Sequence, residues 1–153
     1  RLLALMSRAL DETTALNLKF DEHGLIPAIV TDARDGTVLM FAHMNREALD
    51  ITFVTGQVHF YSRSRKALWK KGETSGETFT AEREAERLCE TFAAISVLTD
   101  CDQDVLQIKV TPEGHGAACH TGRKSCFYRK IVNGELEFID NEKLFDPDFV
   151  YRK

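Results

Sequence analysis

Residues 100–127 read DCDQDVLQIKVTPEGHGAACHTGRKSCF, and this stretch holds three of the four cysteines of the chain. Three aspartates stand at alternate positions at its start, and two cysteines flank a glycine-containing segment at its end. Carboxylates suit hard divalent cations, whereas thiolates suit zinc and other soft metals. The stretch therefore predicts metal binding, with a β-strand over residues 105–110 between its two groups of ligands.

The acidic group would lie on one face of the chain if the segment were extended, because side chains alternate along a strand. This face would carry the three aspartates Asp100, Asp102 and Asp104. Cys101 would point to the opposite face. Neighbouring carboxylates repel one another unless a cation lies between them, so Mg²⁺, Mn²⁺ or Ca²⁺ is expected. An EF-hand loop is excluded, since Val105 and Thr111 occupy its glycine and glutamate positions. A solvated acidic turn is the alternative.

The cysteines predict a second site, for a soft metal. Cys119 and Cys126 would be brought together by a tight loop, and a third thiolate would come from elsewhere. Three protein ligands leave a fourth position for water, which is the pattern of catalytic zinc. A disulfide between Cys119 and Cys126, or two buried free thiols, would also account for the pair.

Four segments of the chain resemble one family of enzymes. They read LMFAHMNREAL at 39–49, VHFYSRSRKALWKKGETSG at 58–76, DCDQD at 100–104 and ACHTGRKSCF at 118–127. On these segments the chain is similar to phosphoribosyl-AMP cyclohydrolase, an enzyme of histidine biosynthesis. The resemblance implies a zinc- and magnesium-dependent hydrolase that opens the adenine ring of 1-(5-phosphoribosyl)-AMP at the N1–C6 bond.

The same resemblance implies roles for individual residues. Mg²⁺ would be bound by the three aspartates of DCDQD, namely Asp100, Asp102 and Asp104. Zn²⁺ would be bound by three cysteines contributed across a homodimer, namely Cys101, Cys119 and Cys126. His120, next to Cys119, is the first candidate for moving the protons of the reaction, and His115 is the second.

A basic segment that runs into a Gly/Ser/Thr loop predicts a site for phosphate. Arginine offers a bidentate fork to a phosphate, and backbone N–H groups near glycines can approach it closely. The expected substrate-binding residues are Arg63, Arg65, Trp69, Lys71, Gly72, Glu73, Thr74 and Ser75. Trp69 would stack on the purine. A solvated basic loop with Trp69 in the core is the alternative.

Composition is that of a globular protein, with 43% hydrophobic residues. The net charge of −4 argues against general nucleic-acid binding. No apolar run approaches the ~20 residues that a membrane span needs. Four cysteines without a visible signal peptide favour a reducing compartment, so a cytoplasmic protein is expected, with no nucleic-acid or membrane partner.

Local patterns predict an α+β fold in a single domain over residues 1–153. Helices are expected at 1–17 and after the N-cap Asn45, and hairpins at 26–44 and around Asn133–Gly134. Further strands are expected at 58–62, 94–98 and 105–110. The resemblance implies that small antiparallel and mixed sheets form a barrel-like core with flanking short helices, within an intertwined homodimer.

Residues 78–94 depart from the family pattern. They are rich in helix formers and predict an inserted helix near the entrance of the active site or the edge of the dimer. Cys89 in this segment is interpreted as a packed thiol, or else as a fourth zinc ligand. Two other functions stay open on the sequence: a zinc hydrolase or deaminase for another purine nucleotide, and a non-catalytic binding module stabilised by zinc.

Overall fold

The β1–β2 hairpin organises the fold. The structure, a computed structural model, describes residues 11–72, 79–81 and 96–150. β1 (Leu25–Asp32) pairs antiparallel with β2 (Val38–Asn45), which confirms the predicted hairpin. Pro27, which cannot donate to a ladder, stands near the start of β1, one residue before pairing with β7 (Leu106–Pro112) begins.

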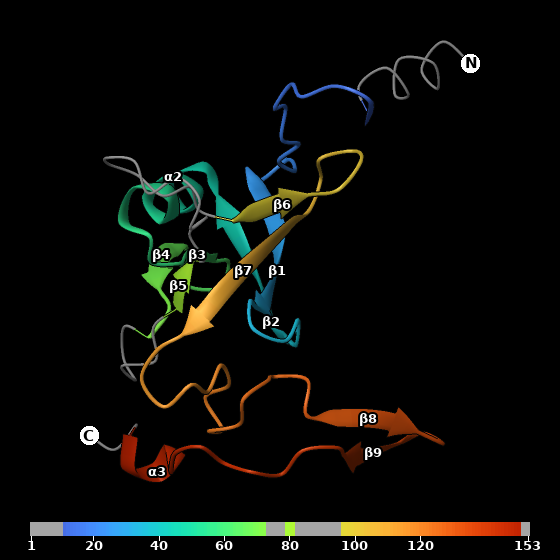
Figure 1. Ribbon diagram of the computed structural model, residues 1–153, viewed down its shortest axis with the longest axis vertical. Coiled ribbons are helices and arrows are strands. Elements are labelled where there is room, and N and C mark those ends of the chain that lie inside the picture. The colour runs from blue at the N-terminus through green and yellow to red at the C-terminus, as the bar shows by residue number, and fades with distance from the viewer. Residues whose placement is uncertain (1–10, 73–78, 82–95, 151–153) are drawn as a thin grey trace.

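A five-stranded mixed sheet surrounds this hairpin. The strand order is β2-β1-β7-β5, and β6 also pairs with β7. β1 and β7 run parallel, whereas β5 (Phe79–Ala81) and β6 (Val97–Thr99) pair antiparallel with β7. Figure 1 shows β7 running the length of the sheet, with the β6–β7 loop at one end and the cysteine segment beyond the other. The two groups of predicted ligands therefore lie at opposite ends of β7.

The one long described helix, α2 (Arg46–Thr55), follows β2 directly and begins after the predicted N-cap. The Asn45 side chain accepts a hydrogen bond of 2.8 Å from the amide of Ala48. At the other end Gly56 adopts a left-handed conformation, with φ of 72°, and donates to Thr52. These caps satisfy backbone groups that the helix itself leaves unpaired.

Two separate hairpins complete the described strands. β3 (His59–Ser62) pairs with β4 (Ala67–Lys70), and β8 (Arg129–Val132) pairs with β9 (Glu135–Phe138). Asn133 and Gly134 form the β8–β9 turn with φ angles of 50° and 79°, as their sequence predicts. A short helix, α3 (Pro147–Val150), follows β9.

The hydrophobic core lies on one face of the five-stranded sheet, between the strands, α2 and the β3–β4 hairpin. Its fully buried side chains include Ile26, Val30, Leu39, Met44, Phe60, Leu106, Ile108 and Val110. The described residues form a mostly-β structure with small mixed and antiparallel sheets and few short helices. The expected barrel-like core is not found among them, because the main sheet is open and the two hairpins are separate sheets.

The helices predicted at 1–17 and 78–94 are not confirmed, unlike the two hairpins. The helix predicted over 1–17 falls partly outside the described residues, and residues 14–17 have no regular secondary structure. Most of the insertion at 78–94, including Cys89, also lies outside them. Its start is wrong, however, since residues 79–81 form β5 against β7. None of the helices in the described ranges is long and apolar enough to cross a membrane.

Candidate metal centres and substrate site

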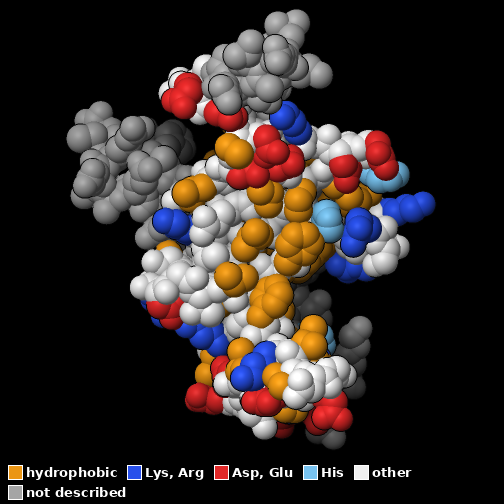
Figure 2. All heavy atoms as spheres, turned by 90° about the vertical axis from the view of Figure 1, so that its right-hand side faces the viewer, with side chains coloured by type: hydrophobic (Ala, Val, Ile, Leu, Met, Phe, Trp, Pro, Cys, Tyr) orange, Lys and Arg blue, Asp and Glu red, His pale blue; other side chains and the backbone are white. Residues whose placement is uncertain are grey.

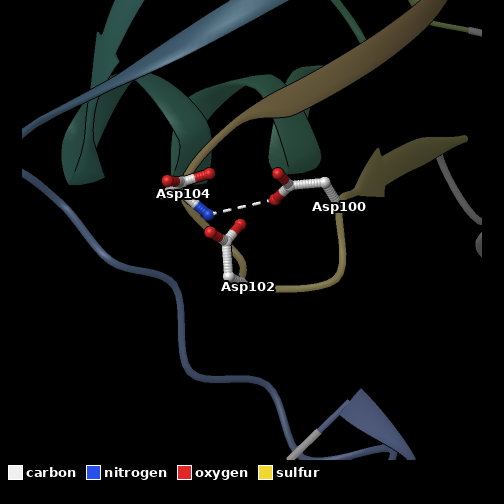
Figure 3. A group of neighbouring side chains, drawn as sticks. All are labelled: Asp100, Asp102 and Asp104. Carbon is white, nitrogen blue, oxygen red and sulfur yellow. Dashed lines mark hydrogen bonds between the residues drawn. The ribbon is translucent and has the colours of Figure 1, made fainter. Parts of the chain in front are cut away.

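The three aspartates of DCDQD gather in the loop that joins β6 to β7 (Figure 3). The predicted extended conformation is wrong here. Because Thr99 of β6 pairs with Leu106 of the antiparallel strand β7, the chain must reverse between them. Gln103 makes this reversal possible by adopting a positive φ of 60°, which is uncommon for a residue other than glycine. The aspartates are thus collected by a turn and not by the alternation of a strand.

The geometry of this loop fits a hard divalent cation. Oxygen atoms of Asp100, Asp102 and Asp104 all lie within 4.8 Å of one another, and all three residues are exposed. Hydrogen bonding with the Asp102 carboxyl, together with burial and the charge of Asp100, raises the pKa of Asp104. Burial acts to raise the pKa of Asp100, but hydrogen bonds from Asp102 and from the Asp104 amide outweigh it and lower that pKa. These opposite shifts reflect carboxylates that lie close together, and a bound cation would offset their repulsion.

Gln103, the fourth residue of DCDQD, links the loop to the N-terminal segment by hydrogen bonds. Its side-chain oxygen accepts from the amide of Asn17 at 2.7 Å, and its side-chain nitrogen donates to the carbonyl of Ala15 at 3.0 Å. Its own carbonyl accepts from the amide of Lys19 at 2.8 Å. Sequence reasoning missed this residue, since nothing in the motif indicates a partner more than 80 positions away.

The second group of ligands, Cys119 and Cys126, lies in a compact loop after β7. The amide of Cys119 donates to the carbonyl of Arg123 at 3.1 Å. The amide of Gly122 donates to the carbonyl of Cys119 at 3.0 Å. Thr121 donates its hydroxyl hydrogen to the Cys119 sulfur at 3.1 Å. Both thiols are free, so the alternative of a disulfide does not hold in this structure.

The two thiols lie close enough to interact. Burial raises the pKa of the Cys126 thiol to about 12, and the charge of Cys119 and a hydrogen bond with it act in the same direction. Cys126 is exposed, whereas Cys119 is buried. Lys71 opposes the rise, and its ammonium donates to the carbonyl of Ala118 at 2.7 Å. A pair of adjacent thiols beside an ammonium suits zinc, which stabilises both as thiolates.

Cys101 does not join this pair within one chain. It precedes β7, which has seven residues, whereas Cys119 follows it. At a rise of about 3.3 Å per residue, the strand alone spans roughly 20 Å. In the described ranges, the aspartates form the only set of three potential metal ligands within 4.8 Å.

The predicted substrate-binding residues fall into three environments. Arg63 and Arg65 are exposed in the turn between β3 and β4. Trp69 is partly buried and packs on Phe60, with ring centroids 4.9 Å apart, so it is at least partly a core side chain. Lys71 contacts the cysteine loop, Gly72 follows it, and Glu73, Thr74 and Ser75 lie outside the described residues.

Both histidine candidates are exposed, at different distances from the thiols along the chain. His120 is adjacent to the buried Cys119. His115 lies five residues before His120, with its ring 5.4 Å from that of Phe145. The sequence position of His120 places it nearer the proposed zinc ligands.

Comparison with known proteins points to one family. The pattern of the family described as "Phosphoribosyl-AMP cyclohydrolase" matches residues 40–128, which include both groups of ligands and the basic segment. The chain belongs to this family. A phosphoribosyl-AMP cyclohydrolase of Rhizobium etli is 48% identical over 149 residues, covering 95% of this chain and 91% of the relative. One of Nitrobacter winogradskyi is 51% identical over 147 residues, covering 93% and 91%.

In this member of the phosphoribosyl-AMP cyclohydrolase family, the buried carboxylate of Asp32 supports the fold beside the cysteine loop. Arg34 donates to both of its oxygens, at 3.0 and 2.8 Å, and Lys124 lies 3.7 Å away. The side-chain hydrogen bond from Arg34 is the largest cause of a lowered pKa for Asp32, while burial and the charge of Asp35 oppose it. The folded state thus favours the ionised form of Asp32.

Asp32→Asn is expected to lower the free energy of unfolding at pH 7 by about 2 kcal/mol, because it leaves charged donors without their anion. A lowered pKa stabilises the fold above the ordinary value of 3.8, and this contribution disappears as the pH falls through the folded-state pKa. Urea unfolding at pH 7 and pH 3 should therefore show a smaller difference in the variant than in the wild type. Equal differences would contradict the assignment.

Proposed function

We propose that the chain hydrolyses the N1–C6 bond of the adenine ring of 1-(5-phosphoribosyl)-AMP, using Mg²⁺ bound by DCDQD and Zn²⁺ bound by the cysteines. The reaction adds one water across this bond, with the oxygen going to C6 and a proton to N1. The observation that carries the proposal is the presence of two separate ligand groups, three carboxylates and a thiol pair, in a chain about half identical to named cyclohydrolases.

Different residues of the chain would bind the metals and position the substrate. Zinc, when bound, supplies a Lewis acid that activates water at neutral pH. Asp100, Asp102 and Asp104 would hold the magnesium that orients substrate oxygens. Lys71 links the substrate segment to the cysteine loop through the carbonyl of Ala118. The Lys71 side chain would therefore position the substrate-binding segment relative to the zinc ligands.

The distribution of cysteines supports a homodimer in which each zinc site takes Cys119 and Cys126 from one chain and Cys101 from the other. Among the described residues, Cys119 and Cys126 are the only neighbouring thiols, because β7 separates Cys101 from them. A catalytic zinc needs three protein ligands. A second copy can bring the missing thiolate without any change in the fold.

An apolar face of the main sheet offers a surface for this second copy. Phe41 of β2, Ile29 of β1 and Leu98 of β6 form one row across the sheet, and all are at least about one-third exposed. A groove of about 410 Å³ runs beside this row to Asp100. Figure 2 shows hydrophobic side chains gathered on this side of the molecule, with acidic side chains next to them. Exposed apolar patches of this kind mark interaction surfaces.

His120→Ala is expected to lower kcat by about 10²–10³-fold with zinc content unchanged, because a general acid–base group contributes that much. Metal analysis and steady-state kinetics on the same preparation test this. His115→Ala serves as the comparison and should have the smaller effect. An active, zinc-loaded His120→Ala protein would rule out the role.

Arg63→Gln and Arg65→Gln are each expected to raise KM by about tenfold, because a charge-assisted hydrogen bond to phosphate contributes roughly 1.5 kcal/mol. Lys130→Met, which removes an exposed cation from β8, is the control and should leave KM unchanged. Wild-type kinetics for both arginine variants would refute their assignment to the substrate.

The experiment that tests the function as a whole is turnover of phosphoribosyl-AMP by the purified protein. Ring opening is followed by the change in ultraviolet absorbance, before and after treatment with a zinc chelator. We expect turnover that the chelator abolishes and added zinc restores. A dimeric, zinc-loaded protein without turnover would refute this substrate and leave the metal ligands standing.

A further inference from the structure

The turn between β1 and β2 carries two carboxylates that face the cysteine loop. Asp32 ends β1 with a fully buried side chain, and Asp35 follows with a half-exposed one. In sequence this segment is only a hairpin turn, with Gly36 at a φ of 78°. Nothing in its pattern indicates a partner almost 90 residues away.

Lys124, between the two cysteines, bonds to this turn. Its ammonium lies 2.6 Å from a carboxylate oxygen of Asp35 and 3.7 Å from one of Asp32. Since Arg34 already takes both oxygens of Asp32, Asp35 is the principal partner of Lys124. The hydrogen bond from Lys124 is also the largest cause of the strongly lowered pKa of Asp35, ahead of the Thr37 amide.

The next two residues of the loop bond to the same hairpin. The Ser125 hydroxyl donates to the carbonyl of Val38 at 2.6 Å. The amide of Cys126 donates to the carbonyl of Leu39 at 2.8 Å, and the Leu39 side chain is fully buried in the core. Residues 124–126 are therefore held by three successive contacts, and the last fixes the backbone of the proposed zinc ligand itself.

We propose that Lys124, held by Asp35 and Asp32, is a positioning residue that keeps Cys126 in the geometry needed to bind zinc together with Cys119. The inference rests on the proposed zinc site. Ordering a loop on metal binding costs conformational entropy, so a loop fixed in advance binds its metal more tightly. Residues that orient metal ligands typically contribute 10–100-fold in metal affinity, whereas an ion pair that served only the surface would contribute little.

The test measures the zinc dissociation constant of the purified, reduced protein by competition with a chromophoric chelator, without substrate. Lys124→Met and Asp35→Asn are each expected to weaken zinc binding by 10-fold or more. The double variant should be no weaker than the worse single variant, because both remove the same contact. Lys124→Arg, which keeps the charge and can still reach the carboxylates, should restore most of the affinity.

A readout on zinc-free protein separates positioning from general stability. The urea midpoint of the zinc-free variants should stay close to that of the wild type. The exposed Lys130–Glu137 pair, 3.5 Å apart on the β8–β9 hairpin, is the matched control. Lys130→Met and Glu137→Gln should leave zinc affinity within twofold of the wild type.

Two results would overturn the proposal: zinc affinity unchanged in Lys124→Met and Asp35→Asn, or a loss of affinity matched by an equal loss of stability in zinc-free protein. Either can occur in an enzyme that turns over phosphoribosyl-AMP normally. Conversely, a zinc-loaded wild type without turnover would refute the proposed function and leave the role of Lys124 intact. The two failures are thus distinguishable.

Discussion

Chains that carry Cys101→Ser and chains that carry Cys126→Ser are expected to be inactive alone and to regain activity together. A zinc site that uses Cys101 of one chain and Cys126 of the other loses a ligand in either homodimer. In the mixed dimer both substitutions fall on the same site, and the other site is intact. Mixed dimers isolated through a different tag on each chain should therefore have about half the wild-type activity.

Each homodimer of these variants should lose at least about 100-fold in activity. Residues that merely orient metal ligands already contribute 10–100-fold, so a direct ligand must contribute more. Zinc content per chain, measured on the same samples, should fall with activity in the homodimers and return to about one zinc per mixed dimer.

The mixture of Cys119→Ser with Cys126→Ser is the control. These two ligands come from the same chain, so every site of the mixed dimer lacks one of them. No recovery is expected. Recovery in this control, or none in the mixture with Cys101→Ser, would contradict the sharing of zinc ligands between chains.

Gly122→Ala is expected to be the most destabilising single change in the cysteine loop, lowering the free energy of unfolding by about 3 kcal/mol. Gly122 has a φ of 90°, and a Cβ there would overlap the carbonyl oxygen of Phe145. The amide of Leu144 also donates to the Gly122 carbonyl at 2.7 Å. The loop and the C-terminal segment would have to separate to admit a methyl group.

Gly116→Ala separates the two causes of this effect. Gly116 has a similar φ of 82°, but a Cβ there would meet no atom within 4 Å. This variant should lose only about 1 kcal/mol, the cost of a left-handed conformation for a residue with a side chain. Denaturant unfolding of both proteins, with and without zinc, measures the difference. Equal losses would show that contact with Phe145 contributes nothing.

Local sequence signals predicted the elements of this fold well where a turn or cap was involved. The β1–β2 hairpin, the N-cap of α2 and the Asn133–Gly134 turn are all confirmed. Each depends on residues within a few positions of one another. The acidic segment was predicted wrongly because alternation suggested a strand, whereas pairing of β6 with β7 imposes a turn there.

The sequence by itself determined the family, the identity of the potential metal ligands and the short-range elements, because ligand chemistry and turn preferences belong to individual residues and their neighbours. Only the tertiary structure decided which ligands meet. Pairing of β1 with β7 and β6 with β7 puts Cys101 and Cys119 at opposite ends of a strand and brings Lys124 to Asp35. Such distances follow from strand register across many residues, which no local pattern records.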